Sequence, residues 1–310
     1  MKILKPKFWD SKSLSLFSIV FLPISFFYQL ILYVKEKISK QKKFSVPVIC
    51  VGNIYIGGTG KTPVSIKIFE ILKELKMNPV IIKKNYKDQK DEILLTKKYC
   101  EILVGSKREL SIEEAIEKKF NIIILDDGYQ DFGIKKDMNI VCFNENQQIG
   151  NGFSIPSGPL RQSLKSLRNC NVVFYNGTKD RIFEQKIKKH NPKIEFVYYK
   201  YEATNINEFK NKKLIALAGI GNPDNFFNFL EDYKLNIIKK LRYPDHYSFS
   251  KKNLDNLLQL KIKYNAKLVT TEKDYMRIDP QYINEFDFIP IKIRLQSAND
   301  LTKILRKNIL

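Results

Sequence analysis

The chain has 310 residues, 44% of them hydrophobic and 28% charged, so it is long enough for two domains and too apolar to be disordered. Its 54 Lys and Arg residues outnumber its 33 Asp and Glu residues and give a net charge of +21. That charge favours anionic partners such as acidic lipid or a phosphorylated substrate. No aromatic-and-basic recognition motif accompanies it, so we predict no nucleic-acid binding. The cysteines form no C-x-x-C pair, which predicts buried thiols and argues against a zinc site.

An uncharged segment lies near the start of the chain. Residues 14–34 carry no charge, and lysines flank the segment on both sides. The segment has about the length needed to cross a bilayer core. Pro23, Gln29 and several serines weaken the spanning interpretation and allow a bent helix in the interface. We therefore predict that residues 1–43 form a membrane-anchoring helix with a basic flank, and both arrangements stay open.

A glycine-rich loop follows at residues 52–62. Val48–Val51 is an unbroken apolar run typical of a buried parallel strand. The loop then reads Gly57, Gly58, Thr59, Gly60, Lys61 and Thr62, and a helical pattern begins. Backbone N–H groups at such a helix start bind the phosphates of ATP, a lysine reaches the outer phosphates, and a threonine hydroxyl binds Mg²⁺. The P-loop pattern is incomplete, because Tyr55 stands where its first glycine belongs.

Strands and helices alternate along the rest of the chain. Residues 44–200 contain predicted strands at 48–51, 79–82, 122–125, 139–143 and 171–175 and predicted helices at 62–76 and 112–119. Residues 201–310 contain predicted strands at 214–218, 235–239, 266–270 and 288–293 and predicted helices from 223, at 251–263 and at 297–307. Alternation of this kind predicts an α/β fold, with a doubly wound parallel sheet over 44–200 and a second, smaller α/β domain over 201–310.

Asp126 and Asp127 end the apolar strand at 122–125. A carboxylate in that place, in the same sheet as a P-loop, holds Mg²⁺ directly or through water beside the P-loop threonine. The chain therefore contains a candidate metal site formed by Thr62 and Asp126-Asp127.

Four further positions are less specific. A carboxylate of Asp91-Glu92 either orients an attacking hydroxyl or binds a metal. The alternative is that the pair is only a favourable first-turn charge on a helix. Arg161 follows a turn with two prolines and a glycine, and its guanidinium suits developing phosphoryl charge. Arg108 is a weaker candidate for the same work. His246 follows Asp245 in a loop, where it is either structural or a proton acceptor near neutral pH.

Six motifs in order make the chain resemble the tetraacyldisaccharide 4′-kinase family. They are VGNIYIGGTGKTP (51–63), DDGYQ (126–130), GNGFSIPSGPLRQ (150–162), GNPDNFF (221–227), YPDHY (243–247) and TTEKD (270–274). The resemblance implies transfer of the γ-phosphate of Mg²⁺-ATP to the 4′-hydroxyl of tetraacyldisaccharide 1-phosphate, which gives lipid IVA in lipid A biosynthesis. It also implies a P-loop kinase-like fold, a second domain that closes the active-site cleft, and a location on the cytoplasmic face of the inner membrane.

The resemblance implies a set of site residues. Lys61 and Thr62 become the phosphate and Mg²⁺ residues, Asp126 a metal ligand, and Asp127 and Gln130 part of the nucleotide site. Asp91 resembles the family's catalytic aspartate and Glu92 its metal-associated neighbour. His246 completes an Asp–His pair that activates the hydroxyl, while Arg161 and Arg108 face the phosphates.

The sequence departs from the family pattern in three places. The family's Arg-Gly-Tyr-Gly turn after the second strand reads Lys84-Asn85-Tyr86-Lys87, and the segment up to Asp91 is short, with Lys90 in place of a glycine. Asp131 and Tyr247 replace two histidines of the family. These departures make Asp91 and Glu92 the least secure correspondence.

One alternative is a membrane-associated switch ATPase of the partitioning type. That class carries a signature lysine in its loop where this chain has Ile56, which counts against it.

Overall fold

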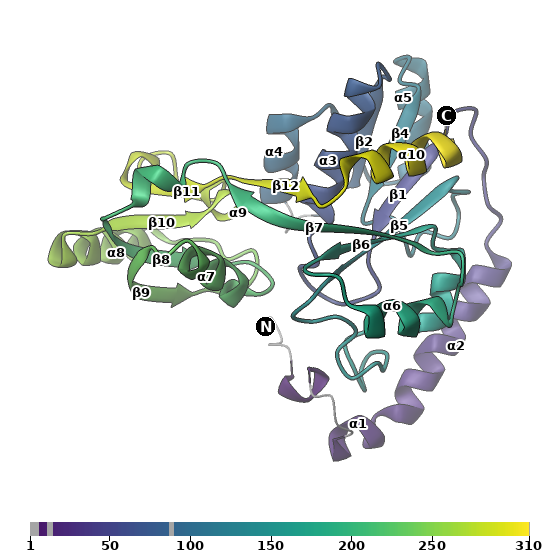
Figure 1. Cartoon of the computed structure of the whole chain (residues 1–310), viewed down its shortest axis with the longest axis horizontal. Coiled ribbons are helices and arrows are strands. Elements are labelled where there is room, and N and C mark those ends of the chain that lie inside the picture. Colours follow the sequence, from purple (N-terminus) through teal and green to yellow (C-terminus); the bar gives the residue numbers. More distant parts are fainter. Residues whose placement is uncertain (1–5, 11–14, 87–89, 310) are drawn as a thin grey trace. The chain divides into compact units, whose positions relative to one another are not determined.

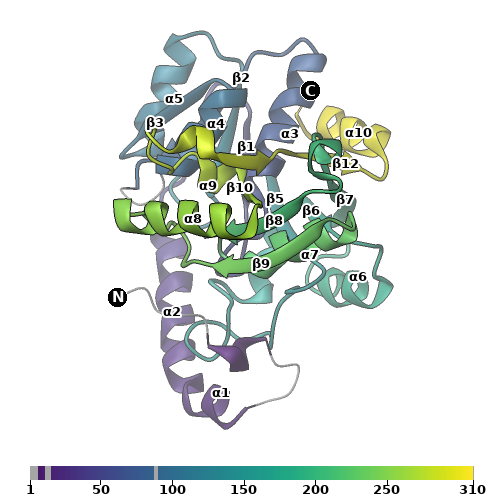
Figure 2. The ribbon, with the colours of Figure 1, turned by 90° about the vertical axis from the view of Figure 1, so that its left-hand side faces the viewer.

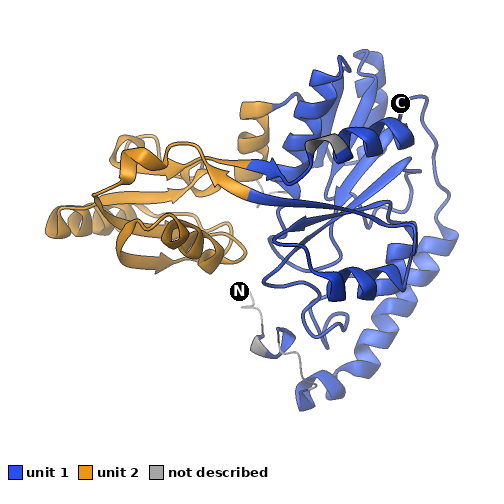
Figure 3. Ribbon diagram, in the orientation of Figure 1, with its two compact units in different colours: residues 1–85, 100–200, 293–310 blue, residues 86–99, 201–292 orange. Residues whose placement is uncertain are grey.

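The computed structural model describes residues 6–10, 15–86 and 90–309 (Figure 1). The chain divides into two compact units, shown in blue and orange in Figure 3. Unit 1 comprises residues 1–85, 100–200 and 293–310, and unit 2 comprises residues 86–99 and 201–292. Each unit contains one sheet, and each is described separately below.

The sheet of unit 1 has eight strands in the order β12-β7-β6-β5-β1-β4-β2-β3. They are β1 (Val48–Gly52), β2 (Pro79–Lys84), β3 (Ile102–Gly105), β4 (Ile122–Asp126), β5 (Met138–Asn144), β6 (Val172–Asn176), β7 (Glu195–Ala203) and β12 (Ile291–Leu295). Every neighbouring pair from β7 to β3 is parallel. The predicted α/β class and parallel sheet are therefore confirmed.

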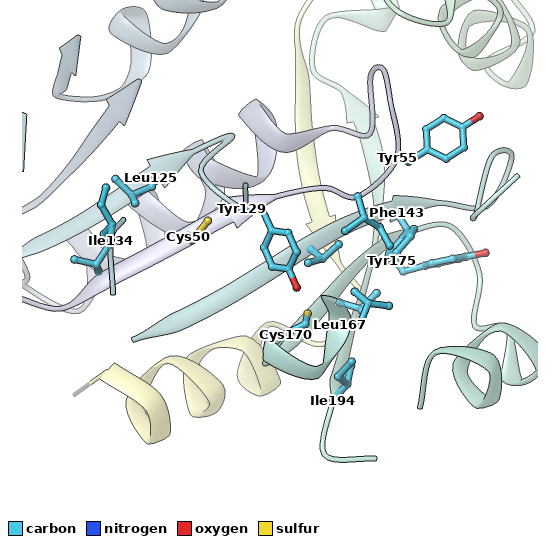
Figure 4. Close-up of a cluster of buried hydrophobic side chains, with 14 of the residues drawn as sticks. Cys50, Tyr55, Leu125, Tyr129, Ile134, Phe143, Leu167, Cys170, Tyr175 and Ile194 are labelled. Atoms are coloured by element: carbon cyan, nitrogen blue, oxygen red, sulfur yellow. The ribbon is translucent and has the colours of Figure 1, made fainter. Parts of the chain in front are cut away.

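Helices cover both faces of this sheet. They are α3 (Lys61–Glu74), α5 (Arg108–Glu117), α6 (Arg181–Lys188) and α10 (Ala298–Ile309). Ile112 of α5 and Phe183 of α6 share one core cluster with alternate residues of the strands, such as Cys50 and Leu125. Figure 4 shows part of this cluster, including Tyr129. Helix α3 packs against β1, β2 and β4 on the other face, so the sheet is doubly wound.

The sheet of unit 2 has four parallel strands in the order β11-β10-β8-β9. They are β8 (Lys213–Ala218), β9 (Asn236–Arg242), β10 (Lys267–Thr271) and β11 (Phe286–Ile289), and the helices are α4 (Lys90–Tyr99), α7 (Pro223–Asp232), α8 (Lys251–Tyr264) and α9 (Glu272–Tyr275). Phe227 of α7 packs with Leu214 and Ala216, whereas Leu254 of α8 packs with Ile215. Alternate residues of β8 thus face two helices on opposite faces of the sheet.

The N-terminal segment folds into α1 (Leu16–Val20) and α2 (Leu22–Ile38), the purple helices of Figures 1 and 2. Pro23 has no N–H to give to the carbonyl of Ile19, and the helix is interrupted at Phe21. Within the described part of the chain, no helix is both long and apolar enough to cross a membrane. Residues 1–5 and 11–14 of the predicted anchoring segment (1–43) lie outside the described residues.

Two segments differ from the predicted domain boundaries. Residues 293–310 belong to unit 1, because β12 extends the edge of the large sheet beside β7. Residues 86–99 belong to unit 2, because α4 packs on α9. The predicted single strand at 288–293 is wrong, since Pro290 separates β11 from β12 and the two strands join different sheets. Residues 1–43 are part of unit 1 instead of a separate domain.

Candidate active site

The glycine loop of unit 1 connects β1 to α3 and has the geometry of an anion-binding turn. Gly57 and Gly60 have φ angles of 105° and 84°, which L-residues with a side chain rarely adopt. Gly60 is the N-cap of α3 and brings no capping side chain, so the first backbone N–H groups of the helix are available to a ligand. Together with the positive end of the helix dipole they suit a phosphate group.

Side chains beneath the loop hold its shape. Asn53 is fully buried and donates from Nδ2 to the carbonyl of Gly57 (3.2 Å) and to Thr59 Oγ1 (2.8 Å). Gln130 in turn donates from Nε2 to the carbonyl of Asn53 (2.8 Å). Tyr55, which stands at the missing first glycine, is buried and donates to Asp10 Oδ1 (2.8 Å). The loop therefore keeps an ordered structure with Tyr55 in place of the glycine. Gln130 contributes to that order through its hydrogen bond to Asn53.

Asp127 lies between two cations at the start of α3. Its Oδ1 is 3.6 Å from Lys61 Nζ, and Arg161 donates from Nη1 to Oδ1 at 3.1 Å. Arg161 reaches this place because its segment pairs with the loop, the Arg161 N–H donating to the carbonyl of Ile54. Burial raises the pKa of Asp127, but the charges of Lys61 and Arg161 outweigh burial and lower the pKa overall. Lys61, Arg161 and Asp127 are thus one charged group beside the loop.

Thr62 and Asp126 meet as the sequence predicted. Thr62 Oγ1 donates to Asp126 Oδ2 at 3.0 Å, and both residues are buried. Asp126 Oδ1 is buried and has no hydrogen-bond partner among the described residues. An orphaned carboxylate oxygen beside a threonine hydroxyl fits a hard cation such as Mg²⁺. A third group also contacts this pair: Lys83 Nζ lies 2.5 Å from Asp126 Oδ2 and 3.1 Å from Thr62 Oγ1.

Arg108 contacts the backbone of the turn after β4. It is buried and donates from Nη2 to the carbonyls of Asp126 and Asp127, both at 3.0 Å, and lies 3.4 Å from Asp131. These contacts hold the two aspartates in place. Binding of Arg108 to nucleotide remains a prediction.

Unit 2 brings Asp91 and His246 together although 155 positions separate them. Both carboxylate oxygens of Asp91 lie 3.0 Å from His246 Nδ1. An ionised carboxylate can only accept, so Nδ1 carries the proton of this bond. The backbone of His246 is held in the left-handed region (φ 56°), and its N–H donates to the carbonyl of Gly219.

Cations surround the Asp91 carboxylate. Burial raises its pKa, but the hydrogen bond from His246 and the charges of Lys273 and Arg277 lower the pKa overall. Arg277 Nε lies 3.2 Å from Asp91 Oδ2. Asp91 is therefore ionised at neutral pH and able to orient the imidazole of His246.

Comparison with known proteins decides the family. The model of the tetraacyldisaccharide-1-P 4′-kinase family matches residues 17–310. The chain is 42% identical to tetraacyldisaccharide 4′-kinase of Pelagibacter ubique over 99% of this chain and 98% of that protein. It is 33% identical to tetraacyldisaccharide 4′-kinase of Rickettsia typhi over 92% of each. The chain belongs to the tetraacyldisaccharide-1-P 4′-kinase family. The resemblance inferred from six motifs is confirmed.

A solved structure supports the fold of this 4′-kinase family member. The crystal structure of LpxK from Aquifex aeolicus in complex with ATP has a TM-score of 0.73, with 21% identity, and the match covers 94% of this chain and 99% of that one. The predicted P-loop kinase-like fold is therefore confirmed. Membership of this family also sets aside the switch ATPase of the partitioning type.

Three site residues of this 4′-kinase family member escaped the sequence analysis: Lys83, Lys273 and Arg277. Lys273 Nζ contacts Glu92 Oε1 (2.9 Å), Asp245 Oδ1 (3.3 Å) and His246 Nε2 (3.4 Å). Thr271 caps the start of α9 at this place, since its Oγ1 accepts from the N–H of Asp274 at 3.0 Å. A lysine next to a capping residue gives no local signal of its distant partners.

Replacing Lys273 by methionine is expected to lower the free energy of unfolding by about 3 kcal/mol, because it removes a cation from Glu92, whose side chain is 23% exposed, and from Asp91, whose side chain is 1% exposed. Urea denaturation, followed by far-UV circular dichroism, measures the change in the free energy of unfolding. The control is Lys267→Met, whose pair with Asp287 is more than one-third exposed on both sides and contributes less than about 1 kcal/mol. Equal losses in the two variants would show that the cluster around Lys273 is not an ion network that stabilises the fold.

Proposed function

We propose that this protein is an ATP-dependent lipid kinase that phosphorylates the 4′-hydroxyl of tetraacyldisaccharide 1-phosphate to give lipid IVA. The observation that carries the proposal is the Asp91–His246 pair. A nucleotide switch needs only a phosphate-binding loop, whereas transfer to an alcohol also needs a group that accepts the proton of the hydroxyl. The names of the family and of its curated relatives supply the acceptor.

Unit 1 carries the phosphate-binding half of this chemistry. The N–H groups at the start of α3 and the ammonium of Lys61 hold the outer phosphates of ATP, and Arg161 stabilises charge that develops on the transferred group. The LpxK structure from Aquifex aeolicus was solved in complex with ATP, which supports the donor. The orphaned Asp126 Oδ1 and the Thr62 hydroxyl fit Mg²⁺. Mg²⁺ bound there would supply charge neutralisation of the phosphates. Glu92, the other predicted metal residue, belongs to unit 2 and pairs with Lys273.

Unit 2 carries the proton-accepting half. Asp91 accepts a hydrogen bond from the Nδ1–H of His246 and fixes the ring, so that His246 Nε2 takes up the proton of the acceptor hydroxyl. Lys273 and Arg277 keep Asp91 ionised and act as positioning residues.

The test is phosphate transfer from γ-³²P-labelled ATP to tetraacyldisaccharide 1-phosphate in detergent micelles with Mg²⁺. The expected product is a lipid that carries a second phosphate. Hydrolysis of ATP without a labelled lipid would contradict the proposal and favour a nucleotide switch or another acceptor.

The N-terminal helices support a location on an anionic membrane surface, at the cytoplasmic face of the inner membrane. Polar residues of this segment face the rest of unit 1: Ser25 Oγ donates to the carbonyl of Ser154 (2.8 Å), and Gln29 accepts from the N–H of Ser163 (3.0 Å). The outward face is apolar, with Phe17, Phe27 and Ile31 between 62% and 66% exposed. This polarity is the reverse of a water-facing helix and suits an interface.

Replacing both Phe27 and Ile31 by serine is expected to weaken binding to vesicles roughly 100-fold, because each side chain loses roughly 1.5 kcal/mol or more of apolar burial in the bilayer. Flotation with phosphatidylglycerol-containing vesicles measures the bound fraction against lipid concentration. The control is Ile262→Ser on α8, a single isoleucine that is 79% exposed in unit 2. Unchanged flotation of the double variant would remove α2 as the membrane contact.

A further inference from the structure

Lys83 is a buried lysine at the end of an apolar strand. It is 4% exposed and follows the run Pro79-Val80-Ile81-Ile82 of β2. Strands β2 and β4 are parallel neighbours in which Ile82 pairs with Leu125, so the next residues of the two strands, Lys83 and Asp126, lie side by side near the carboxyl ends of the strands. The register of the sheet thus places an ammonium group against the Asp126 carboxylate.

Hydrogen bonds join Lys83, Thr62 and Asp126 in a triangle. Its Nζ donates to Asp126 Oδ2 at 2.5 Å and to Thr62 Oγ1 at 3.1 Å, and Thr62 Oγ1 donates to Asp126 Oδ2 at 3.0 Å. A carboxylate that is 2% exposed requires a compensating cation or strong donors. Lys83 supplies that cation, since Lys61 and Arg161 contact the Asp127 carboxylate. Arg108 donates to the backbone carbonyls of the two aspartates.

The triangle engages Thr62 Oγ1 and Asp126 Oδ2, two of the oxygens beside the candidate metal site, and leaves Asp126 Oδ1 without a partner among the described residues. Mg²⁺ binds oxygen ligands at about 2.0–2.1 Å in a nearly octahedral set. Asp126 Oδ2 accepts two hydrogen bonds here, and the Thr62 hydroxyl points its proton at the carboxylate. A metal that binds Asp126 Oδ1 and Thr62 Oγ1 therefore requires Thr62 to turn its proton away and Lys83 Nζ to release Thr62 Oγ1. Two cations against one carboxylate in a buried place also repel each other.

We propose that Lys83 is a resident cation of the metal subsite, which competes with the divalent ion for Thr62 and Asp126 and lowers the affinity of the subsite for metal alone. The proposal rests on the proposed use of Mg²⁺-ATP. Phosphate oxygens that arrive with the metal give the displaced ammonium a new partner, so metal and nucleotide bind together and the metal alone binds weakly. Lys83 is then a positioning residue that couples the two ligands.

The experiment is a titration of the nucleotide-free protein with MnCl₂, in which electron paramagnetic resonance measures the free Mn²⁺. Lys83→Met is expected to bind one Mn²⁺ about tenfold or more tightly than the wild type, because the competing charge is gone. Adding Asp126→Asn to Lys83→Met is expected to abolish that binding. Because methionine leaves Asp126 without its cation, Lys83→Gln, whose amide keeps a hydrogen-bond donor group, is titrated as well.

The control is Lys118→Met. Lys118 forms an ion pair of 2.6 Å with Glu114 on the exposed surface of unit 1, so it removes the same charge without touching Asp126. Equal Mn²⁺ titrations of the wild type and both Lys83 variants would overturn the proposal, as would tighter binding that survives Asp126→Asn. Failure of the proposed function has a different signature, namely a wild type that makes no phosphorylated lipid whatever the Mn²⁺ titrations show.

Discussion

Replacing Lys61 by methionine is expected to lower kcat for phosphate transfer roughly 10³-fold, the scale on which a single charge aimed at the transferred group contributes. Lys61 is the first residue of α3, directly after Gly60, and its Nζ lies 3.6 Å from Asp127 Oδ1. Methionine keeps most of the volume of the stem and removes the ammonium. Transfer of ³²P to the lipid acceptor at saturating ATP measures the loss.

The matched control is Lys67→Met on the same helix. Lys67 pairs with Glu70 at 3.1 Å, further along α3 from the loop than Lys61. The kcat of Lys67→Met is expected to stay within about twofold of the wild-type value, because replacing a single surface charge usually has a small effect. A Lys61→Met enzyme that retains one-tenth or more of the wild-type kcat would show that the loop N–H groups and Arg161 suffice to bind the phosphates.

Replacing Asp91 by asparagine is expected to lower kcat roughly 10²–10⁴-fold, the usual contribution of acid–base help. Asparagine keeps the shape, but its amide cannot hold an imidazolium as a carboxylate does. Because the glycine loop and Lys61 lie in unit 1, the dissociation constant of ATP is expected to be unchanged. Single-turnover transfer and equilibrium ATP binding, measured on the same preparation, separate the two effects.

The pairing of Asp91 with His246 predicts a non-additive double variant. When two residues act as one unit, replacing either one lowers the rate about as much as replacing both. The double variant Asp91→Asn with His246→Gln is therefore expected to be hardly slower than either single variant. Asp224→Asn is the control in unit 2, since its pair with Arg242 is exposed on both sides. Near-normal turnover of Asp91→Asn, or losses of the two single variants that multiply, would remove the pair from the mechanism.

Local sequence was sufficient for the parts of the site that lie within a few residues of each other. The strand, glycine turn and helix around Lys61 and Thr62 were predicted in the right order, and so was the aspartate pair at the end of β4. Each depends on short-range chemistry, namely an unbroken apolar run, positive φ angles at glycine, and a helix start. These signals are complete within a window of about fifteen residues.

Long-range neighbours were beyond the same reasoning. A lysine at the end of β2 gave no sign of contacting Asp126, because the contact depends on β2 and β4 being adjacent and in register. Lys273 and Arg277 gave none either, because their partner Asp91 is far away in the sequence. Asp91 and Glu92 were assigned from the family resemblance; from the residues alone, a first-turn charge on a helix was the favoured explanation.

The sequence by itself determined the α/β class, the phosphate-binding loop, the candidate metal residues and, through six ordered motifs, the family. Periodicity, glycine conformations and motif order are all properties of short segments, which any adequate core preserves. Only the tertiary structure decided that α4 belongs with unit 2, that β12 completes the sheet of unit 1, and that Lys83 contacts Asp126. Those outcomes depend on which distant elements bury their apolar faces against one another, and sheet register then determines which charged side chains meet.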